Sequence, residues 1–252
     1  MRILLIADVH ANQAALEAVT EPYDVCLCLG DLVEYGPEPG GCVEWVRKRA
    51  AYTVRGNHDH GAAQDVEVQG LGGFRYLTQA TRRPTLAKLS TDDRKYLNDL
   101  PTTSMFKLGG KRFLLVHATP RDPLDEYIPA EVEPWAARLA GVHAEFVCVG
   151  HTHQQFIIPV NGTRVINPGS IGLQRDGDPR ARYAVIDGDD VQLKKVEYDV
   201  EKTVAAVREC TLIDDRAKTM LTEVYRNGRM AYANGKNGYG NGTNGTNGNG
   251  KH

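Results

Sequence analysis

The chain has 252 residues, with 41% apolar and 25% charged residues, which is typical of a soluble globular protein. The 30 basic and 32 acidic residues leave a net charge of −2, and basic clusters such as Arg82-Arg83 are short and indicate solvated helix faces, so no long nucleic-acid partner is expected. No stretch approaches the roughly 18 apolar residues of a membrane span, so no membrane association is expected either.

The first part of the chain alternates short apolar runs with helical patterns, which predicts a βαβαβ order and a layered α/β core. Residues 74–100 carry helical patterns only and are predicted to form an insertion that packs on the side of the sheet and walls a cleft. Gly109-Gly110 and Asn161-Gly162 predict two-residue hairpin turns, and Gly188 separates a third pair of strands. In chain order, strands are predicted at 3–7, 25–29, 52–54, 105–108, 112–116, 146–149, 156–160, 164–166, 183–186 and 191–198, and helices at 13–19, 41–49, within 74–100, and at 134–139, 200–209 and 214–226.

These elements predict an α/β fold of four layers (α+β), in which a two-sheet β-sandwich is flanked by helices. Residues 1–227 would form one domain that contains the helical insertion 74–100. From 234 to 250 the sequence is Asn, Gly and Thr, interrupted only by Lys236 and Tyr239. Such a segment has almost no apolar side chains to offset the entropy of ordering, so 228–252 is predicted to be a disordered tail.

The five cysteines predict a reducing environment. Cys26, Cys28 and Cys148 lie inside apolar runs and are expected to be buried as small hydrophobic residues of a reduced protein. The chain enters a strand pattern at once, with no signal-peptide architecture, so a cytoplasmic location is expected.

Five predicted strands are followed directly by polar residues that could bind a metal. The carboxyl ends of strands are where open α/β sheets place ligands. One His beside one Asp in a loop is more often a structural hydrogen-bonded pair, but five such strand ends together favour a shared functional site. The five clusters are Asp8-Val9-His10, Gly30-Asp31, Gly56-Asn57-His58-Asp59, His117 and Gly150-His151-Thr152-His153.

The donor types in these clusters suit two divalent metal ions. Carboxylate, imidazole and amide oxygen favour ions such as Mn, Fe, Zn or Co, and we expect Mn first, with Ni as a further candidate. Asp31 could bridge two ions, and ions about 3.5–4 Å apart can share a hydroxide and clamp a phosphoryl group. No cysteine lies in the clusters, which argues against a structural zinc site.

The ordered set of clusters resembles the calcineurin-like metallophosphoesterase superfamily. The segments 30–37 (GDLVEYGP), 167–170 (NPGS) and 175–180 (RDGDPR) are similar to its small prokaryotic YfcE-like phosphodiesterase branch. The resemblance covers about residues 1–226. It implies a metallophosphatase-like fold and a dinuclear-metal-dependent phosphoester hydrolase, foremost a phosphodiesterase, that works by in-line attack of a metal-bridging hydroxide without a covalent enzyme intermediate.

The resemblance also implies a role for each matching residue. His58 matches the family's non-ligand histidine, which would donate a proton to the leaving oxygen or bind the phosphate. Substrate-binding roles fall to Asn57, His58 and Arg175. The implied metal ligands are Asp8, His10 and His153 for the first ion, Asn57, His117 and His151 for the second, and Asp31 for both.

Three positions depart from the family pattern. Ala11 replaces the usual Gly, which is tolerable if its backbone is not left-handed. Glu34 replaces a common Gly, and we hypothesise that it is a catalytic residue that orients His58, alongside or in place of Asp59; the alternative is a solvated loop glutamate. Tyr35 occupies the position of a phosphate-binding Arg in the Ser/Thr phosphatase branch, which weakens the case for phosphoprotein substrates.

Other charged residues have less specific interpretations. Arg55 could contact phosphate, but a buried salt bridge is favoured. Arg175 and Arg180 could rim the cleft and bind substrate phosphate; pairing with Asp176 and Asp178 in a turn is the favoured alternative. The 167–170 segment is expected to turn the chain beneath the metals, and two histidines that match no motif position are expected to be structural or exposed, His60 and His143.

Three functions stay open. The first is a metal-dependent phosphodiesterase or phosphomonoesterase acting on a small phosphoester or nucleotide. The second is a nucleoside-polyphosphate or phosphoprotein phosphatase with the same metals. The third is a non-catalytic scaffold like the retromer subunit of this fold, whose metal site is incomplete; here every ligand position is filled. A homo-oligomer is compatible with the sequence.

Overall fold

The computed structural model describes residues 1–230; of the predicted tail, 231–252 lie outside the described residues. Ten strands and eight helices are present in the described part. The strands are β1 (Arg2–Ile6), β2 (Val25–Cys28), β3 (Ala50–Thr53), β4 (Thr103–Leu108), β5 (Lys111–Val116), β6 (Phe146–Cys148), β7 (Gln155–Val160), β8 (Thr163–Pro168), β9 (Ala181–Asp187) and β10 (Asp190–Val196). The helices are α1 (Gln13–Glu17), α2 (Pro39–Arg49), α3 (Asn57–Ala63), α4 (Gly73–Lys88), α5 (Thr91–Asp99), α6 (Val132–Arg138), α7 (Val200–Glu209) and α8 (Asp215–Asn227).

The strands form two five-stranded mixed sheets, in the orders β10-β9-β1-β2-β3 and β4-β5-β6-β8-β7. In the first sheet β1, β2 and β3 are parallel, and in the second β5, β6 and β8 are parallel. The remaining strands pair antiparallel: β4 with β5, β7 with β8 and β9 with β10 form hairpins, and β9 also pairs with β1. The parallel strands matter for function because their carboxyl ends deliver loops to a common edge.

The core is divided into layers by the alternation of side chains along each strand. In β1, Ile3 and Leu5 face the second sheet and pack with Phe113 and Phe146, whereas Leu4 and Ile6 face the helices. Both faces of the central strands are covered, which explains why they read as continuous apolar runs. The predicted two-sheet sandwich flanked by helices is therefore confirmed.

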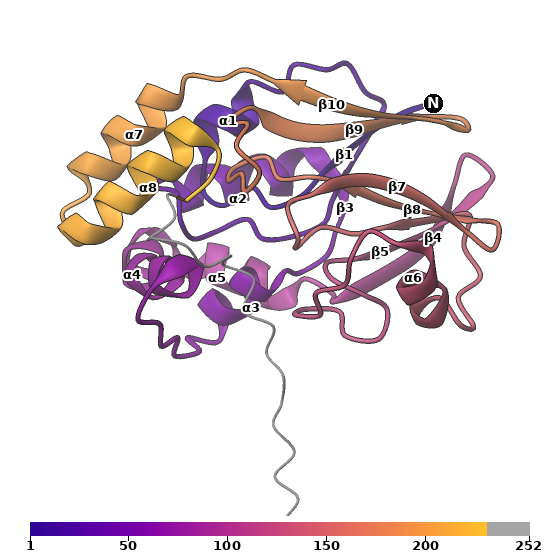
Figure 1. The fold of residues 1–252 in the computed structure, drawn as a ribbon, viewed down its shortest axis with the longest axis horizontal. Helices are drawn as coiled ribbons and strands as arrows, with labels where there is room; N and C mark the ends of the chain where they lie inside the picture. Colours follow the sequence, from indigo (N-terminus) through magenta and orange to yellow (C-terminus); the bar gives the residue numbers. More distant parts are fainter. Residues whose placement is uncertain (231–252) are drawn as a thin grey trace, which may run out of the picture.

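Figure 1 shows where the helices cover the sandwich. Helices α3, α4 and α5 gather on one side of it, α7 and α8 lie beside one another, and α6 lies against the second sheet (Figure 1). Helix α5 contacts α3, and α4 contacts both α2 and α8. Residues 73–99, in which only helical patterns were found, thus lie next to the helix that begins at Asn57.

Most boundaries fall within two residues of those predicted, which is the usual spread at frayed ends. Helix α3 was missed because its sequence, NHDHGAA, has little helix propensity. The two predicted hairpin turns are confirmed, since Gly109, Gly110, Asn161 and Gly162 all have positive φ, as a type I′ turn requires.

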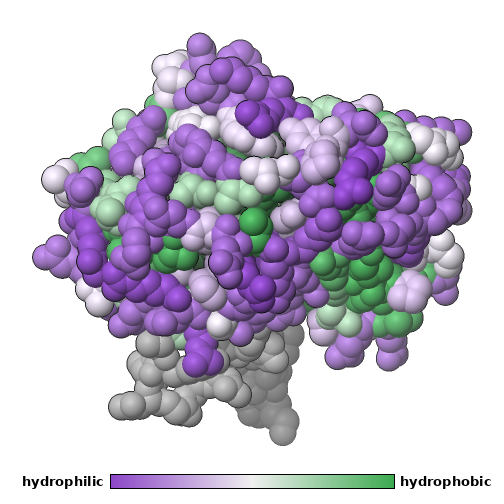
Figure 2. All heavy atoms as spheres, turned by 90° about the horizontal axis from the view of Figure 1, so that it is seen from above, coloured by the Kyte–Doolittle hydropathy of each residue, from purple (hydrophilic) through white to green (hydrophobic). Residues whose placement is uncertain are grey.

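All five cysteines are buried and free, as predicted for Cys26, Cys28 and Cys148. The prediction that Arg82 and Arg83 are both solvated is wrong for Arg82, which is buried; only Arg83 is exposed. Figure 2 shows a face on which hydrophilic residues predominate around smaller apolar patches. In residues 1–230, no helix is both long enough and apolar enough to cross a bilayer.

Candidate metal centre

The five polar clusters meet at one edge of the sandwich. Asp8 follows β1, Asp31 follows β2, and Asn57 opens α3, while His117 and His151 follow the parallel strands β5 and β6. Every proposed ligand is buried except Asn57, which is half-buried. The edge therefore brings together all seven side chains that the sequence singled out as metal ligands.

The first group of donor atoms comes from Asp8, His10 and His153, whose donor atoms lie within 4.8 Å of one another. The Nε2 atoms of His10 and His153 are 3.1 Å apart. Oδ1 of Asp8 lies 3.4 Å from Nε2 of His153 and 4.0 Å from that of His10. Three donors thus surround one small space.

The second group lies beside the first. Oδ1 of Asn57 is 3.1 Å from Nε2 of His117 and 3.1 Å from Nδ1 of His151. Oδ2 of Asp31 is 3.2 Å from Nε2 of His117 and 3.8 Å from Nε2 of His10. One oxygen of Asp31 therefore faces both groups.

The backbone fixes which nitrogen of each ring faces the cluster. Nδ1 of His10 lies 3.2 Å from the carbonyl of Val33, that of His117 lies 2.7 Å from the carbonyl of Leu29, and that of His153 lies 2.5 Å from the carbonyl of Leu173. A carbonyl only accepts, so each Nδ1 carries the proton and donates it. Nε2 of His10 and Nε2 of His153 then present lone pairs to one another, and Nε2 of His117 faces Oδ2 of Asp31, an arrangement that a divalent cation satisfies.

The charge of the metal-free cluster also fits cations. Burial raises the pKa of Asp8 to about 7 and lowers the pKa values of His10, His151 and His153 well below the usual range. Burial would also lower the pKa of His117, but Asp31 outweighs it and raises that pKa to about 9. In the metal-free chain, a proton on His117 therefore supplies part of the positive charge that bound metal ions would supply.

The loops that carry the donors have unusual backbone conformations. Ten non-glycine residues of the described part have positive φ, and eight of them lie in these loops. Such conformations persist only where the surrounding structure imposes them, and they concentrate at functional sites. The eight are Asp8, His10, Ala11, Asp31, Glu34, Tyr35, His151 and His153. Alanine at position 11 was expected to be tolerable only if its backbone is not left-handed. That expectation is not met, because φ of Ala11 is 51°.

Two glycines allow carboxylates to approach the backbone. A Cβ on Gly56 would lie 2.0 Å from Oδ1 of Asp31, and one on Gly150 would lie 2.9 Å from Oδ2 of Asp8. Both distances are too short for any side chain, so these positions require glycine.

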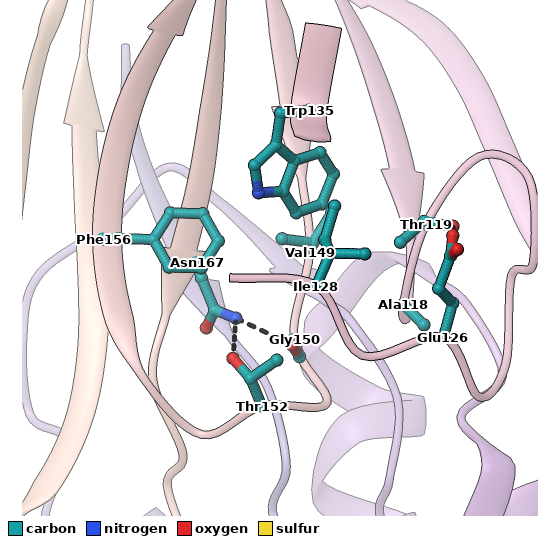
Figure 3. Close-up of a pocket in the computed structure, with 10 residues that line it drawn as sticks. All are labelled: Ala118, Thr119, Glu126, Ile128, Trp135, Val149, Gly150, Thr152, Phe156 and Asn167. Atoms are coloured by element: carbon teal, nitrogen blue, oxygen red, sulfur yellow. Dashed lines mark hydrogen bonds between the residues drawn. The ribbon is translucent and has the colours of Figure 1, made fainter. Parts of the chain in front are cut away.

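The 167–170 turn holds two of the loops in place. Asn167 donates to the carbonyl of Gly150 at 2.7 Å and to Oγ1 of Thr152 at 3.1 Å, as the dashed lines in Figure 3 show. Ser170 donates to the carbonyl of Asp8 at 2.8 Å. The turn thus ties the loop after β6 and the loop after β1 to β8.

Glu34, rather than Asp59, contacts the ring of His58. Nδ1 of His58 lies 2.5 Å from Oε2 of Glu34, and Glu34 is fully buried, which excludes the solvated-loop alternative. Asp59 accepts instead from the backbone N–H of Asp31 at 2.7 Å, of Leu32 at 2.7 Å and of Gly56 at 3.0 Å. The prediction of Asp59 as a catalytic partner of His58 is corrected: this carboxylate supports the backbone of the Asp31 loop.

Arg175 lies near the cluster, and no carboxylate of residues 1–230 forms a salt bridge with it. Its guanidinium carbon lies 4.5 Å from the ring centroid of Phe74, its Nη1 lies 3.5 Å from the hydroxyl of Tyr127, and its buried Nε has no hydrogen-bond partner. Its charge contributes to lowering the pKa of His153, after burial. The favoured pairing of Arg175 with Asp176 or Asp178 is therefore wrong.

Those two acids pair elsewhere. Asp178 binds Arg180 at 2.8 Å, as the turn alternative predicted, and Asp176 binds the buried Arg182 at 2.6 Å. Arg55 forms no salt bridge within residues 1–230; it donates to the carbonyl of Asn98, so that prediction was also wrong. His60 is half-buried and His143 exposed, as expected.

Sequence reasoning missed three residues around the cluster. Asp125 has an oxygen 3.9 Å from Nε2 of His151, and the ring centroid of Tyr127 is 4.0 Å from that of His151. Both lie on an irregular loop whose path no local pattern predicts. Arg82 contacts Glu34, and a signal existed for it: it shares a buried helix face with Thr78, Thr81 and Thr85 at helical spacing.

Comparisons with known proteins agree with this geometry. Residues 1–191 match the model of the calcineurin-like phosphoesterase superfamily domain. An uncharacterised protein of Methanocaldococcus jannaschii is 30% identical over 79% of this chain and 89% of its own length. The crystal structure of a metallophosphoesterase from Sphaerobacter thermophilus has 34% identity and a TM-score of 0.73 over 88% of this chain and 98% of that one. A hypothetical protein from Pyrococcus horikoshii, 22% identical with a TM-score of 0.77 over 91% of this chain and 99% of its own, shares the fold.

The backbone of Ala11 predicts an unequal response of two buried alanines to glycine. Ala11 and Ala15 are both fully buried, but Ala11 has φ of 51° and Ala15 is helical. Ala15→Gly should lower the free energy of unfolding by about 2 kcal/mol, from the lost methyl burial and helix propensity. The loss in free energy of unfolding caused by Ala11→Gly should be smaller than that caused by Ala15→Gly, by about 1 kcal/mol or more. The reason is that glycine relieves the strain of the left-handed backbone at this position. Urea denaturation of the metal-free protein measures both, and equal losses would contradict the strain.

The donor set predicts that metal binding releases protons. Calorimetric titration of the metal-free chain with Mn²⁺ should give two ions per chain. Because His117 has a pKa of about 9 and Asp8 one of about 7, the affinity should fall as the pH falls through this range, and protons should be released to the buffer. His117→Gln should remove most of the proton release that accompanies metal binding. His143→Gln, which changes an exposed histidine, should leave the proton release unchanged. Binding without proton release, or of a single ion, would count against the site.

Proposed function

The chain belongs to the calcineurin-like phosphoesterase superfamily, and from this premise we propose that it is a phosphodiesterase that uses two divalent metal ions. The observation that carries the proposal is the position of Asp31, whose Oδ2 faces a donor group on either side. A carboxylate oxygen in that position suits a ligand shared by two ions.

Each ion would have its own side chains. Asp8, His10 and His153 would hold the first, Asn57, His117 and His151 the second, and Asp31 both. When bound, the ions would supply the hydroxide that attacks phosphorus and neutralise the charge that develops on the phosphoryl oxygens. Mn is the first candidate, with Fe, Zn, Co or Ni as alternatives, since nitrogen and oxygen donors without thiolate accept all of them.

His58 would act on the leaving group. Burial favours its neutral ring, but Asp31 and the hydrogen bond to Glu34 outweigh this and raise the pKa of His58, so a protonated ring is available near neutral pH. Because Glu34 accepts from Nδ1, Nε2 points away from Glu34 and toward the cluster, where it lies 3.4 Å from the hydroxyl of Tyr35 and 4.0 Å from Oδ2 of Asp31. In this position His58 can protonate the departing oxygen.

Arg175 would bind the phosphate. A guanidinium with no carboxylate partner among residues 1–230, close enough to the cluster for its charge to help lower the pKa values of His10, His151 and His153, is suited to an oxyanion. Asn57 would contact the substrate as well as the second ion. Asp59 is retained as a support of the Asp31 loop and not as a catalytic residue.

A small phosphodiester fits better than the alternatives. Tyr35 stands where a phosphoprotein phosphatase would have a phosphate-binding arginine, and its hydroxyl is buried against Thr78 at 3.0 Å. A non-catalytic scaffold would not need the complete donor set, the left-handed loops and the Glu34–His58 pair together. A nucleoside polyphosphate remains the second candidate substrate, because Arg175 would suit a further phosphate. Five buried free thiols fit the cytoplasm, and a homo-oligomer is compatible with the surface.

The decisive experiment is a screen of the Mn²⁺-reconstituted chain against aryl phosphodiesters, monoesters, cyclic nucleotides and dinucleoside polyphosphates. We expect the highest kcat/KM for a diester. Asp31→Asn should reduce turnover by more than about 100-fold with the fold intact, since it removes the shared charged ligand. Asp65→Asn, at an exposed position, is the control. Substantial activity in Asp31→Asn would refute a shared metal ligand.

Arg175 can be tested by product inhibition. Arg175→Met should weaken inhibition by inorganic phosphate by about 10- to 100-fold, the value of a charged hydrogen bond, and Arg175→Lys should lose less. Arg180→Met, which removes an exposed arginine already paired with Asp178, should leave inhibition unchanged. If inorganic phosphate inhibits the unmodified chain and Arg175→Met with the same inhibition constant, Arg175 does not contact the phosphate.

A further inference from the structure

A buried arginine, Arg82, lies behind His58, the proposed proton donor. Arg82 is on α4 and only 7% exposed. Its Nη1 donates to the carbonyl of Gly61 at 2.8 Å and to that of Val66 at 2.5 Å, and its Nε donates to Oε1 of Glu34. The side chain therefore ties α4 to the C-terminal half of α3 and to the loop after β2.

Glu34 uses its two oxygens for two different partners. Oε1 accepts from Arg82, and Oε2 faces Nδ1 of His58 at 2.5 Å. The backbone of Glu34 has φ of 69°, in a loop whose next residue is also left-handed, so the direction of its side chain is not imposed by regular secondary structure. Arg82 is the one cation that the structure places within salt-bridge distance of Glu34 in residues 1–230, apart from a protonated His58.

We propose that Arg82 is a positioning residue for the proton-transfer step: it holds Glu34 so that Oε2 accepts from His58 and directs the opposite ring nitrogen toward the leaving oxygen. The proposal rests on the proposed function of His58. It makes α4, which supplies no metal ligand, part of the machinery that orients the acid.

The burial of the chain Arg82–Glu34–His58 explains why the cation matters. Glu34 is fully buried, and a buried carboxylate without its cationic partner is strongly unfavourable. Without Arg82, nothing else in residues 1–230 would hold Oε1, and Glu34 would turn toward another donor. That change removes the acceptor for Nδ1 of His58 and releases the ring.

Gly61 offers an independent way to disturb the same contact. A Cβ on Gly61 would lie 2.4 Å from Nη2 of Arg82, so Gly61→Ala must displace the guanidinium without changing any charge. Because Arg82 is anchored at both Gly61 and Val66, that displacement should weaken its hold on Glu34.

The test uses the full chain reconstituted with Mn²⁺ and methyl aryl phosphates whose leaving groups differ in basicity. A lost proton donor slows poor leaving groups more than good ones, whereas general damage slows all equally. His58→Asn and Glu34→Gln define the effect of a lost or misdirected donor. Arg82→Met should slow hydrolysis of the substrate with the poorest leaving group by about 10- to 100-fold. It should also make the rate depend more steeply on leaving-group basicity, as His58→Asn and Glu34→Gln do. Arg82→Lys should recover part of the loss, and Arg83→Met, at the exposed neighbour, should match the unmodified chain.

The double variant Arg82→Met/Glu34→Gln shows whether Arg82 acts through Glu34. If it does, the double variant is no slower than Glu34→Gln alone, because the two residues act as one unit. Fully additive losses, or a uniform slowing of all leaving groups by Arg82→Met, would overturn the proposal. Gly61→Ala supplies the same comparison if Arg82→Met fails to fold.

A spectroscopic readout on the metal-free chain separates this inference from the proposed function. The Nδ1 proton of His58, hydrogen-bonded to Glu34, should give a strongly downfield ¹H resonance that Glu34→Gln abolishes. Arg82→Met should shift or broaden it, and Arg83→Met should not. An unchanged resonance in Arg82→Met contradicts the positioning role. An unmodified chain that hydrolyses none of the phosphoesters would instead refute the proposed function, whatever the resonance shows.

Discussion

The structure depends on one constraint: several buried metal-binding atoms, most of them without protons of their own, must be kept close together. Nε2 of His10 and Nε2 of His153 lie only 3.1 Å apart, and Oδ1 of Asp8 lies 3.4 Å from Nε2 of His153. Backbone carbonyls hold the outward nitrogens of three of the rings, so the inward lone pairs cannot turn away. Such an arrangement is stable in the folded chain because the surrounding scaffold imposes it, and a divalent cation then relieves the repulsion.

The scaffold achieves this with two sheets rather than one. The parallel strands β1 and β2 supply the loops of Asp8 and Asp31, and the parallel strands β5 and β6 of the other sheet supply His117 and His151. The two carboxyl edges face each other, so each ion would be held by residues from both sheets. The helical segment 73–99 closes this edge from the side and contributes Arg82, which reaches Glu34 behind His58. The proposed metal ligands and the residues proposed to orient His58 thus come from different layers of the same fold.

The layered fold and the convergence of the polar clusters could be predicted because both follow from local patterns: apolar runs of strand length, and polar residues directly after them. Residues whose positions depend on long-range packing were not predictable in the same way. Arg82 is separated from Glu34 by 48 residues, and its burial follows from the packing of α4, not from its neighbour Arg83. Asp59 was misread because a carboxylate beside a histidine in sequence can point away from it in a helical turn. Arg175 was expected to pair with nearby acids, whereas the fold turns its guanidinium toward Phe74 and Tyr127.

The crowding of unprotonated donors has a consequence for the life of the protein in a cell. A chain that has not yet acquired its ions keeps these atoms together without compensation, and ions that bind only the folded state add stability in proportion to the logarithm of their concentration. Newly synthesised chains would therefore be most open to proteases when divalent ions are scarce, and steady-state abundance would follow metal supply even at constant synthesis. The amount of enzyme, as well as its activity, would then report the metal status of its surroundings.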